Sequence, residues 1–116
     1  GMIKDTIHTR EVDTAYMRGV DLLQKRRYAK ALYILHEYHD RNTVVTLLSL
    51  GHDAQAFEML DGLEQTATVE YLKAVACSRL GRKAEGREHF LTACGMDERM
   101  QYRGNLDPEI TELLKE

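Results

Sequence analysis

Residues 50–60 read LGHDAQAFEML, and the pattern of this stretch occurs twice more in the chain. Residues 80–90 read LGRKAEGREHF, and a more divergent copy at residues 25–35 reads KRRYAKALYIL. Each copy has a turn residue, a small residue five positions later and a large apolar residue four positions after that: Arg26, Ala31 and Leu35; Gly51, Ala56 and Leu60; Gly81, Gly86 and Phe90. Because a small side chain lets two helices approach closely, this recurrence predicts stacked helical hairpins.

The composition fits one all-helical domain. The chain has 116 residues, of which 43% are hydrophobic and 30% charged, with one Pro and eight Gly. A net charge of −3 gives no electrostatic reason to expect a nucleic-acid partner. No apolar run reaches the 18 residues or more that a membrane-spanning helix requires. We therefore expect neither nucleic-acid binding nor a membrane span.

The repeat, together with the residues typical of turns and helix ends, predicts three segments. These are a flexible N-terminal segment at 1–9, a helical repeat domain at 10–104 with hairpins at about 10–39, 41–62 and 67–95, and a C-terminal capping helix at 105–116. The run at 43–50, TVVTLLSL, is ambiguous, because its β-branched residues suit a strand equally well. The repeat around it favours a helix.

Helix ends are predicted from local signals. The first helix should start near Thr9, and the second should extend to His39 and bury Tyr28, Leu32 and Tyr38. Asp40 or Asn42 is the expected cap of the third helix, and Thr66 or Thr68 that of the fifth. Gly95 is expected to stop the helix that begins at Arg82, followed by one helical turn and a loop up to Gly104. Asp107 should cap the last helix, with Pro108 in its first turn.

These features resemble the tetratricopeptide repeat, a helix–turn–helix unit of about 34 residues. Gly19, Val44 and Ala74 stand where its first helix carries a small residue, and Tyr28 stands at the aromatic position of its turn. The copies here are shorter than the family's repeat. The resemblance implies an all-α fold, a right-handed α-α superhelix of about three hairpins closed by the capping helix.

The resemblance also implies a function without catalysis. In such solenoids the first helices of the hairpins line a concave groove that holds a partner peptide or protein segment. The expected groove residues are Tyr16, Val20, Leu23, Gln24, Asn42, Val45, Ser49, Tyr71, Val75, Ser78 and Arg79. Val20, Val45 and Val75 favour binding of an apolar side chain of the partner. The alternative is a scaffold or oligomerisation domain of a longer bacterial envelope or secretion-associated protein, with these residues packed on a neighbouring domain or in a homodimer. The sequence does not decide between a cytoplasmic location and, for part of a longer exported chain, a periplasmic one.

Candidate catalytic and metal-binding residues are few. His36 and His39 are three positions apart, whereas the zinc-protease signature places its histidines four apart. They are interpreted as surface residues, and a hydrolase using either one with a carboxylate would need an enclosed pocket. Cys77 and Cys94 lack Cys-x-x-Cys spacing and are expected to be two small thiols in neighbouring helices. We expect no catalytic residue, metal ligand or cofactor.

Overall fold

The computed structural model of the protein describes residues 13–115, and every regular element in this range is an α-helix. The helices are α2 (Thr14–Gln24), α3 (Tyr28–Leu35), α4 (Arg41–Ser49), α5 (Asp53–Asp61), α6 (Ala67–Leu80), α7 (Lys83–Met96), α8 (Arg99–Asn105) and α9 (Pro108–Leu114). The predicted all-α class is therefore confirmed for the described residues. The predicted helix start near Thr9 lies outside them.

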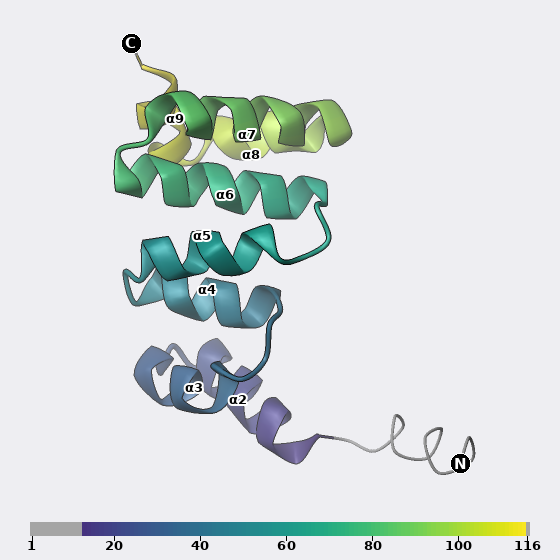
Figure 1. Cartoon of the computed structure of the whole chain (residues 1–116), viewed down its shortest axis with the longest axis vertical. Helices are drawn as coiled ribbons and strands as arrows, with labels where there is room; N and C mark the ends of the chain where they lie inside the picture. The colour runs from purple at the N-terminus through teal and green to yellow at the C-terminus, as the bar shows by residue number, and fades with distance from the viewer. Residues whose placement is uncertain (1–12, 116) are drawn as a thin grey trace, which may run out of the picture.

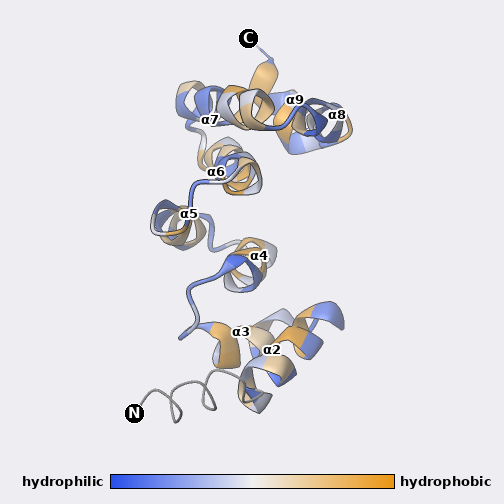
Figure 2. Ribbon diagram, turned by 90° about the vertical axis from the view of Figure 1, so that its right-hand side faces the viewer, coloured by the Kyte–Doolittle hydropathy of each residue, from blue (hydrophilic) through white to orange (hydrophobic). Residues whose placement is uncertain are grey.

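The helices follow one another along the long axis of a molecule that measures 55 × 30 × 22 Å. Each helix from α2 to α7 packs against the next, so α2 and α3 lie at one end and α7 to α9 at the other (Figure 1). The chain then turns back, and α9 packs against both α6 and α7. Seen from the side, α4, α5 and α6 follow a zigzag path between the two ends (Figure 2).

The three turn residues of the repeated pattern share one backbone conformation. The φ angles are 60° at Arg26, 80° at Gly51 and 77° at Gly81. Among the described residues, Arg26 is the one non-glycine residue with positive φ. Glycine adopts this conformation without a steric penalty, whereas a side chain makes it costly. The pattern therefore located all three turns correctly, including the one without a glycine.

The small and large residues of the pattern lie inside the protein. Ala31, Ala56 and Gly86 are buried, and so are Leu35, Leu60 and Phe90. A Cβ atom placed on Gly86 would lie only 2.7 Å from Leu113 Cδ1 and 2.9 Å from Cys77 Cβ. The absence of a side chain at Gly86 therefore allows α7 to approach α6 and α9 this closely.

The ambiguous run at 43–50 lies mainly in helix α4, as predicted. Asp40 caps this helix by accepting a hydrogen bond from the Thr43 amide at 3.0 Å. The hydroxyl of Thr46 donates to the Asn42 carbonyl at 2.8 Å. Ser49 makes the same kind of bond to the carbonyl four residues before it. These local bonds satisfy the polar groups within the helix.

The second predicted helix is too long at its C-terminal end. Helix α3 ends at Leu35 and not at His39. The Leu35 carbonyl accepts hydrogen bonds from the Tyr38 amide at 2.8 Å and the Thr43 hydroxyl at 3.0 Å, so it is not available to a further helical turn. Leu32 and Tyr38, predicted to be buried, are half-buried, as is Tyr28.

The predicted stop at Gly95 is wrong. Helix α7 continues through Gly95 to Met96, and the segment predicted as one turn followed by loop forms helix α8. A glycine inside a helix costs about 1 kcal/mol, which does not end a helix where no positive φ is required. Helix α8 lies close to α7 at Gly104. A Cβ atom placed on Gly104 would lie only 2.5 Å from Phe90 Cε1, so the absence of a side chain permits this close approach. Asp107 caps α9 and Pro108 occupies its first turn, as predicted.

Helix α6 lies at the centre of the core. All nine residues from Val69 to Cys77 are buried, so this helix is enclosed on every side. One apolar cluster joins it to α4 and α5 through Leu72, and the other joins it to α7 and α9 through Tyr71. Enclosure of α6 therefore depends on α9 covering the side that α5 and α7 leave open.

Candidate functional site

The N-terminal part of the expected groove is a polar junction between α2 and α4. The hydroxyl of Tyr16 donates to the carboxylate of Asp40 and accepts a hydrogen bond from Asn42 Nδ2 at 2.8 Å. The Tyr16 ring lies 4.8 Å from that of Tyr38, whose hydroxyl donates to Asp13 Oδ2 at 2.7 Å. Burial, followed by the bond to Asp40, raises the pKa of Tyr16. Tyr16 and Asn42 are thus already engaged within the chain.

The other expected groove residues of α2 and α4 are more open to solvent. Val20 and Leu23 are half-buried, while Gln24 and Ser49 are exposed. Val45 is 39% exposed, whereas its neighbour Val44 is fully buried. We call these five residues the α2–α4 strip.

The α6 part of the expected groove is covered by α9. Tyr71 has no exposed surface and Val75 is 7% exposed. The Tyr71 hydroxyl donates to Asp107 Oδ2 at 2.7 Å, and the guanidinium of Arg103 lies 4.2 Å from the centre of its ring. Burial is the main reason that the pKa of Tyr71 is raised well above its ordinary value, and the bond to Asp107 adds to it. A partner can touch Tyr71 only if α9 moves away.

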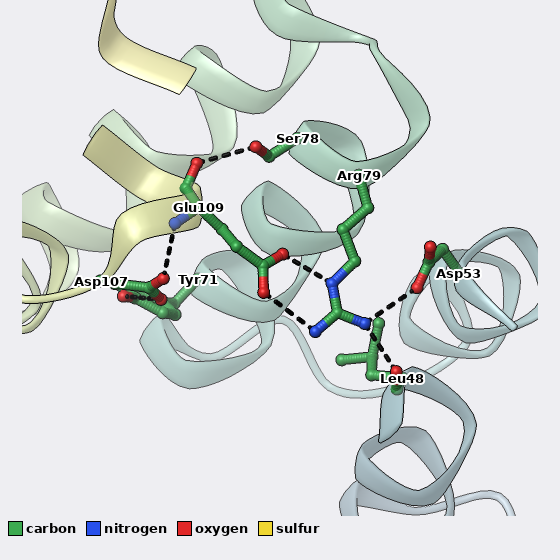
Figure 3. A network of polar contacts seen from close by, with 7 residues as sticks. All are labelled: Leu48, Asp53, Tyr71, Ser78, Arg79, Asp107 and Glu109. Atoms are coloured by element: carbon green, nitrogen blue, oxygen red, sulfur yellow. Dashed lines mark hydrogen bonds and ion pairs between the residues drawn. The ribbon is translucent and has the colours of Figure 1, made fainter. Parts of the chain in front are cut away.

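Arg79 and Ser78 bind the capping helix (Figure 3). The Arg79 guanidinium donates to both carboxylate oxygens of Glu109, at 2.6 and 2.9 Å. It also donates to the Leu48 carbonyl at 2.6 Å and to Asp53 Oδ1 at 3.1 Å. The Ser78 hydroxyl donates to the Glu109 carbonyl at 2.7 Å. One side chain of α6 therefore joins the end of α4, the start of α5 and the start of α9, and the bonds to Glu109 raise the pKa of Arg79.

A groove that the sequence did not predict lies between α3, α4 and α5. Its volume is about 410 Å³. It is lined by Leu32, His36, His39, Thr43, Leu47, Gln55, Glu58, Met59 and Gly62. The sequence carried a signal for it, because Gln55, Glu58 and Met59 are spaced to share one face of α5. We call this cavity the α3–α5 groove.

The two histidines considered as hydrolase candidates both line the α3–α5 groove. His36 Nδ1 lies 2.9 Å from the Tyr33 carbonyl oxygen. Its Nε2 lies 3.9 Å from Glu37 Oε1, and the two side chains are 59% and 78% exposed. His36 therefore sits at the open edge of the groove, and the enclosed pocket that a hydrolase would require is not formed around it.

The two cysteines are free and lie in neighbouring helices, Cys77 buried in α6 and Cys94 half-buried in α7. Burial raises the pKa of Cys77 to about 11. Its thiol lies in a cluster with Glu85 and His89, whose ligand-capable atoms are all within 4.8 Å of one another. Glu70 completes the cluster, with Oε2 2.6 Å from His89 Nδ1. Sequence reasoning missed this cluster, although Glu85 and His89 are four positions apart on one helix.

Comparison with family models, with curated proteins and with solved structures finds no match. Within residues 13–115, no helix is both long and apolar enough to cross a membrane.

Proposed function

We propose that the protein is a non-catalytic interaction module, built as a shortened tetratricopeptide-like superhelix that holds a segment of a partner protein. Support comes from the recurring pattern, since Arg26, Gly51 and Gly81 all have positive φ and the small residues that follow them are buried. A rigid, preformed stack of hairpins lowers the entropy that a binding surface loses when a partner docks.

The α3–α5 groove is the observation that carries the proposal. Its volume of about 410 Å³ falls within the range of about 300–1,000 Å³ that is typical of ligand sites. Leu32, Leu47 and Met59 provide apolar surface. The polar groups are the imidazole of His36 and the carboxylate of Glu58. This combination fits a peptide that inserts an apolar side chain and is positioned by hydrogen bonds around it.

The α2–α4 strip is the second contact surface of the proposal. Val45 and Gln24 are exposed there and free to touch an extended partner. The α6 part of the expected groove contributes only in a form of the protein in which α9 has moved, because α9 covers Tyr71 and Val75.

The experiment is a selection of peptides from a displayed library against the purified chain, followed by affinity measurements on variants. The groove variant is Gln55→Arg with Glu58→Arg, and the matched strip variant is Val45→Arg with Ser49→Arg; all four residues are exposed. We expect the groove variant to weaken binding at least about tenfold, or about 1.4 kcal/mol, with unchanged circular dichroism. The strip variant should weaken it less.

Two outcomes would overturn this assignment. Loss of binding in the strip variant alone would move the partner from the α3–α5 groove to the surface expected from the resemblance. Failure to select any peptide that binds would contradict the interaction function itself.

The scaffold or oligomerisation function is favoured by one specific observation, the exposure of large apolar side chains. Leu106 is 86% exposed, Tyr33 82% and Tyr102 71%. Sedimentation of the wild-type chain beside Leu106→Glu and Tyr33→Glu variants separates the two functions. A tight homodimer that either substitution dissociates supports assembly, and a monomer at all concentrations supports the peptide-binding module.

A further inference from the structure

A cluster of metal-ligating side chains lies between α6 and α7, away from both proposed contact surfaces. The ligand-capable atoms of Cys77, Glu85 and His89 all lie within 4.8 Å of one another. Cys77 comes from α6, whereas Glu85 and His89 are one turn apart on the same face of α7. Within the part of the chain that the structure describes, this is the one group of three or more such residues close enough to share an ion.

A second observation concerns the orientation of the His89 ring. Its Nδ1 lies 2.6 Å from Oε2 of Glu70, a carboxylate that is only 8% exposed. This bond favours the tautomer with the proton on Nδ1, which leaves the lone pair of Nε2 free. Metal-ligating histidines almost always donate their other ring N–H to such a partner. The ring is also packed against Phe57, with centroids 5.8 Å apart in an edge-on arrangement.

The one ligand–ligand distance that the structure fixes individually fits a tetrahedral zinc site, and the three ligand atoms all lie within 4.8 Å of one another. Two ligand atoms bound to zinc at about 2.0–2.3 Å lie about 3.3–3.8 Å from each other. His89 Nε2 is 3.7 Å from Glu85 Oε2, which falls within this range. The Glu85 side chain is 45% exposed, so it has room to adjust its position when an ion binds.

We propose that Cys77, Glu85 and His89 bind a zinc(II) ion, with Glu70 as the residue that orients His89. Zinc accepts one thiolate, one imidazole and one carboxylate in a single site, whereas magnesium and calcium select oxygen ligands alone. Three protein ligands leave the fourth tetrahedral position to water on the exposed side next to Glu85. The ion would join α6 to α7, and this inference is independent of the peptide-binding function.

Binding of zinc requires the Cys77 thiol to lose its proton, because the thiolate is the metal ligand. The proton passes to the solvent as the zinc–sulfur bond forms, and the hydrated ion releases the water molecules that the three protein ligands replace. Zinc affinity should therefore increase with pH.

The test uses the full chain, freed of metal with a chelator and titrated with cobalt(II) as a spectroscopic probe. We expect binding of one equivalent, a thiolate-to-cobalt charge-transfer band in the near ultraviolet and loss of that band when zinc is added. Zinc should also raise the melting temperature. A wild-type chain that binds no cobalt would overturn the proposal. Cobalt that binds without the thiolate band would also overturn it, because this result would indicate adventitious binding by histidines such as His36.

Variants assign the ligands. Cys77→Ser should remove the charge-transfer band, and Glu85→Gln should weaken cobalt binding at least about tenfold by removing one charged ligand. Glu85 is exposed, so this variant keeps the test valid even if Cys77→Ser does not fold. The matched controls are Cys94→Ser and Glu88→Gln, both on α7, which should bind cobalt as the wild type does. Loss of the band in Cys94→Ser, or unchanged affinity in Glu85→Gln, would contradict the assignment.

Discussion

Helices α6 and α2 differ in what surrounds them. Every residue of α6 from Val69 to Cys77 is buried, because α5, α7 and α9 pack around it. In α2 only Gly19 is buried, and among the described helices α2 packs mainly against α3 and, more weakly, against α4 at the end of the stack. Apolar enclosure therefore stabilises the middle and C-terminal part of the protein more than its N-terminal hairpin.

The two helices nevertheless use the same polar contact. Tyr16 of α2 donates its hydroxyl to Asp40, the N-cap of α4, and Tyr71 of α6 donates to Asp107, the N-cap of α9. Each tyrosine lies ten residues before a turn residue with positive φ. The same contact, from a tyrosine hydroxyl to an N-cap aspartate, therefore occurs in two environments: it is half-buried at Tyr16 and fully buried at Tyr71.

The largest effect should come from Phe90, which lies between α6, α8 and α9. Phe90→Ala should lower the free energy of unfolding by about 3–5 kcal/mol, because it removes a buried ring and leaves a cavity. Chemical denaturation measures this loss. The control is Leu91→Ala, the next residue along α7, which is 63% exposed and should change stability by less than about 0.5 kcal/mol. Equal losses in the two variants would contradict the enclosure of α6.

A pair of tyrosine substitutions sharpens the comparison. Tyr71→Phe should cost about 1.5–3 kcal/mol, because it removes a buried hydrogen bond to a carboxylate. Tyr16→Phe should cost less, about 0.5–1.5 kcal/mol, because water can replace its bond to Asp40. Urea denaturation of both variants checks the order. A larger loss for Tyr16→Phe would show that the N-terminal junction, and not α9, limits stability.

Alkaline pH should destabilise the protein through Cys77, a buried residue of α6. Burial raises the pKa of Cys77 to about 11, whereas an unfolded cysteine has a pKa of about 8.5. Above that value the unfolded chain loses a proton that the folded chain keeps, so the free energy of unfolding falls as pH rises. The slope should approach about 1.4 kcal/mol per pH unit from this one group.

Cys77→Ala should reduce the fall in the free energy of unfolding between about pH 8.5 and pH 10, and denaturation at several pH values in the presence of a chelator measures this reduction. The raised pKa of Tyr71 has the same sign and should leave a further fall above pH 10, the ordinary value for tyrosine. An unchanged slope in Cys77→Ala would show that the thiol is accessible to solvent in the folded protein.

The smallest effect concerns Arg26, whose positive φ is strained for a residue with a side chain. Arg26→Gly should raise the free energy of unfolding by about 0.5–1 kcal/mol, because glycine adopts this conformation without a clash. Arg26→Ala is the matched control, since it shortens the side chain and keeps the strain. A gain in stability for alanine as large as that for glycine would indicate relief of charge repulsion and not of backbone strain.

Much of the fold could be predicted from the sequence, because its determinants are local. The turns at Gly51 and Gly81 follow from glycine itself, and the turn at Arg26 was found through the spacing to Ala31. The cap at Asp107 likewise depends on neighbouring residues alone. The helix end at Leu35 could not be found in this way, because it depends on a hydrogen bond from Thr43, in the next hairpin.

The candidate sites were less predictable, because they depend on which helices become neighbours. Nothing near Tyr71 in the sequence indicates that α9 folds back over it and forms the bond to Asp107. Cys77 is brought to Glu85 and His89 by the packing of α6 on α7, and Cys-x-x-Cys spacing does not describe such a site. Long-range packing therefore decided both which expected residues are covered and which unexpected ones meet.

The central claim is that α6 is the enclosed centre of the protein and that the α2–α3 hairpin is its least enclosed part. Native-state hydrogen exchange tests it most directly, because it gives the opening free energy of each amide. The amides of Leu72 to Cys77 should exchange only through global unfolding, and those of α2 through an opening that costs roughly 2 kcal/mol less. Equal protection in α2 and α6, or faster exchange in α6, would contradict the claim.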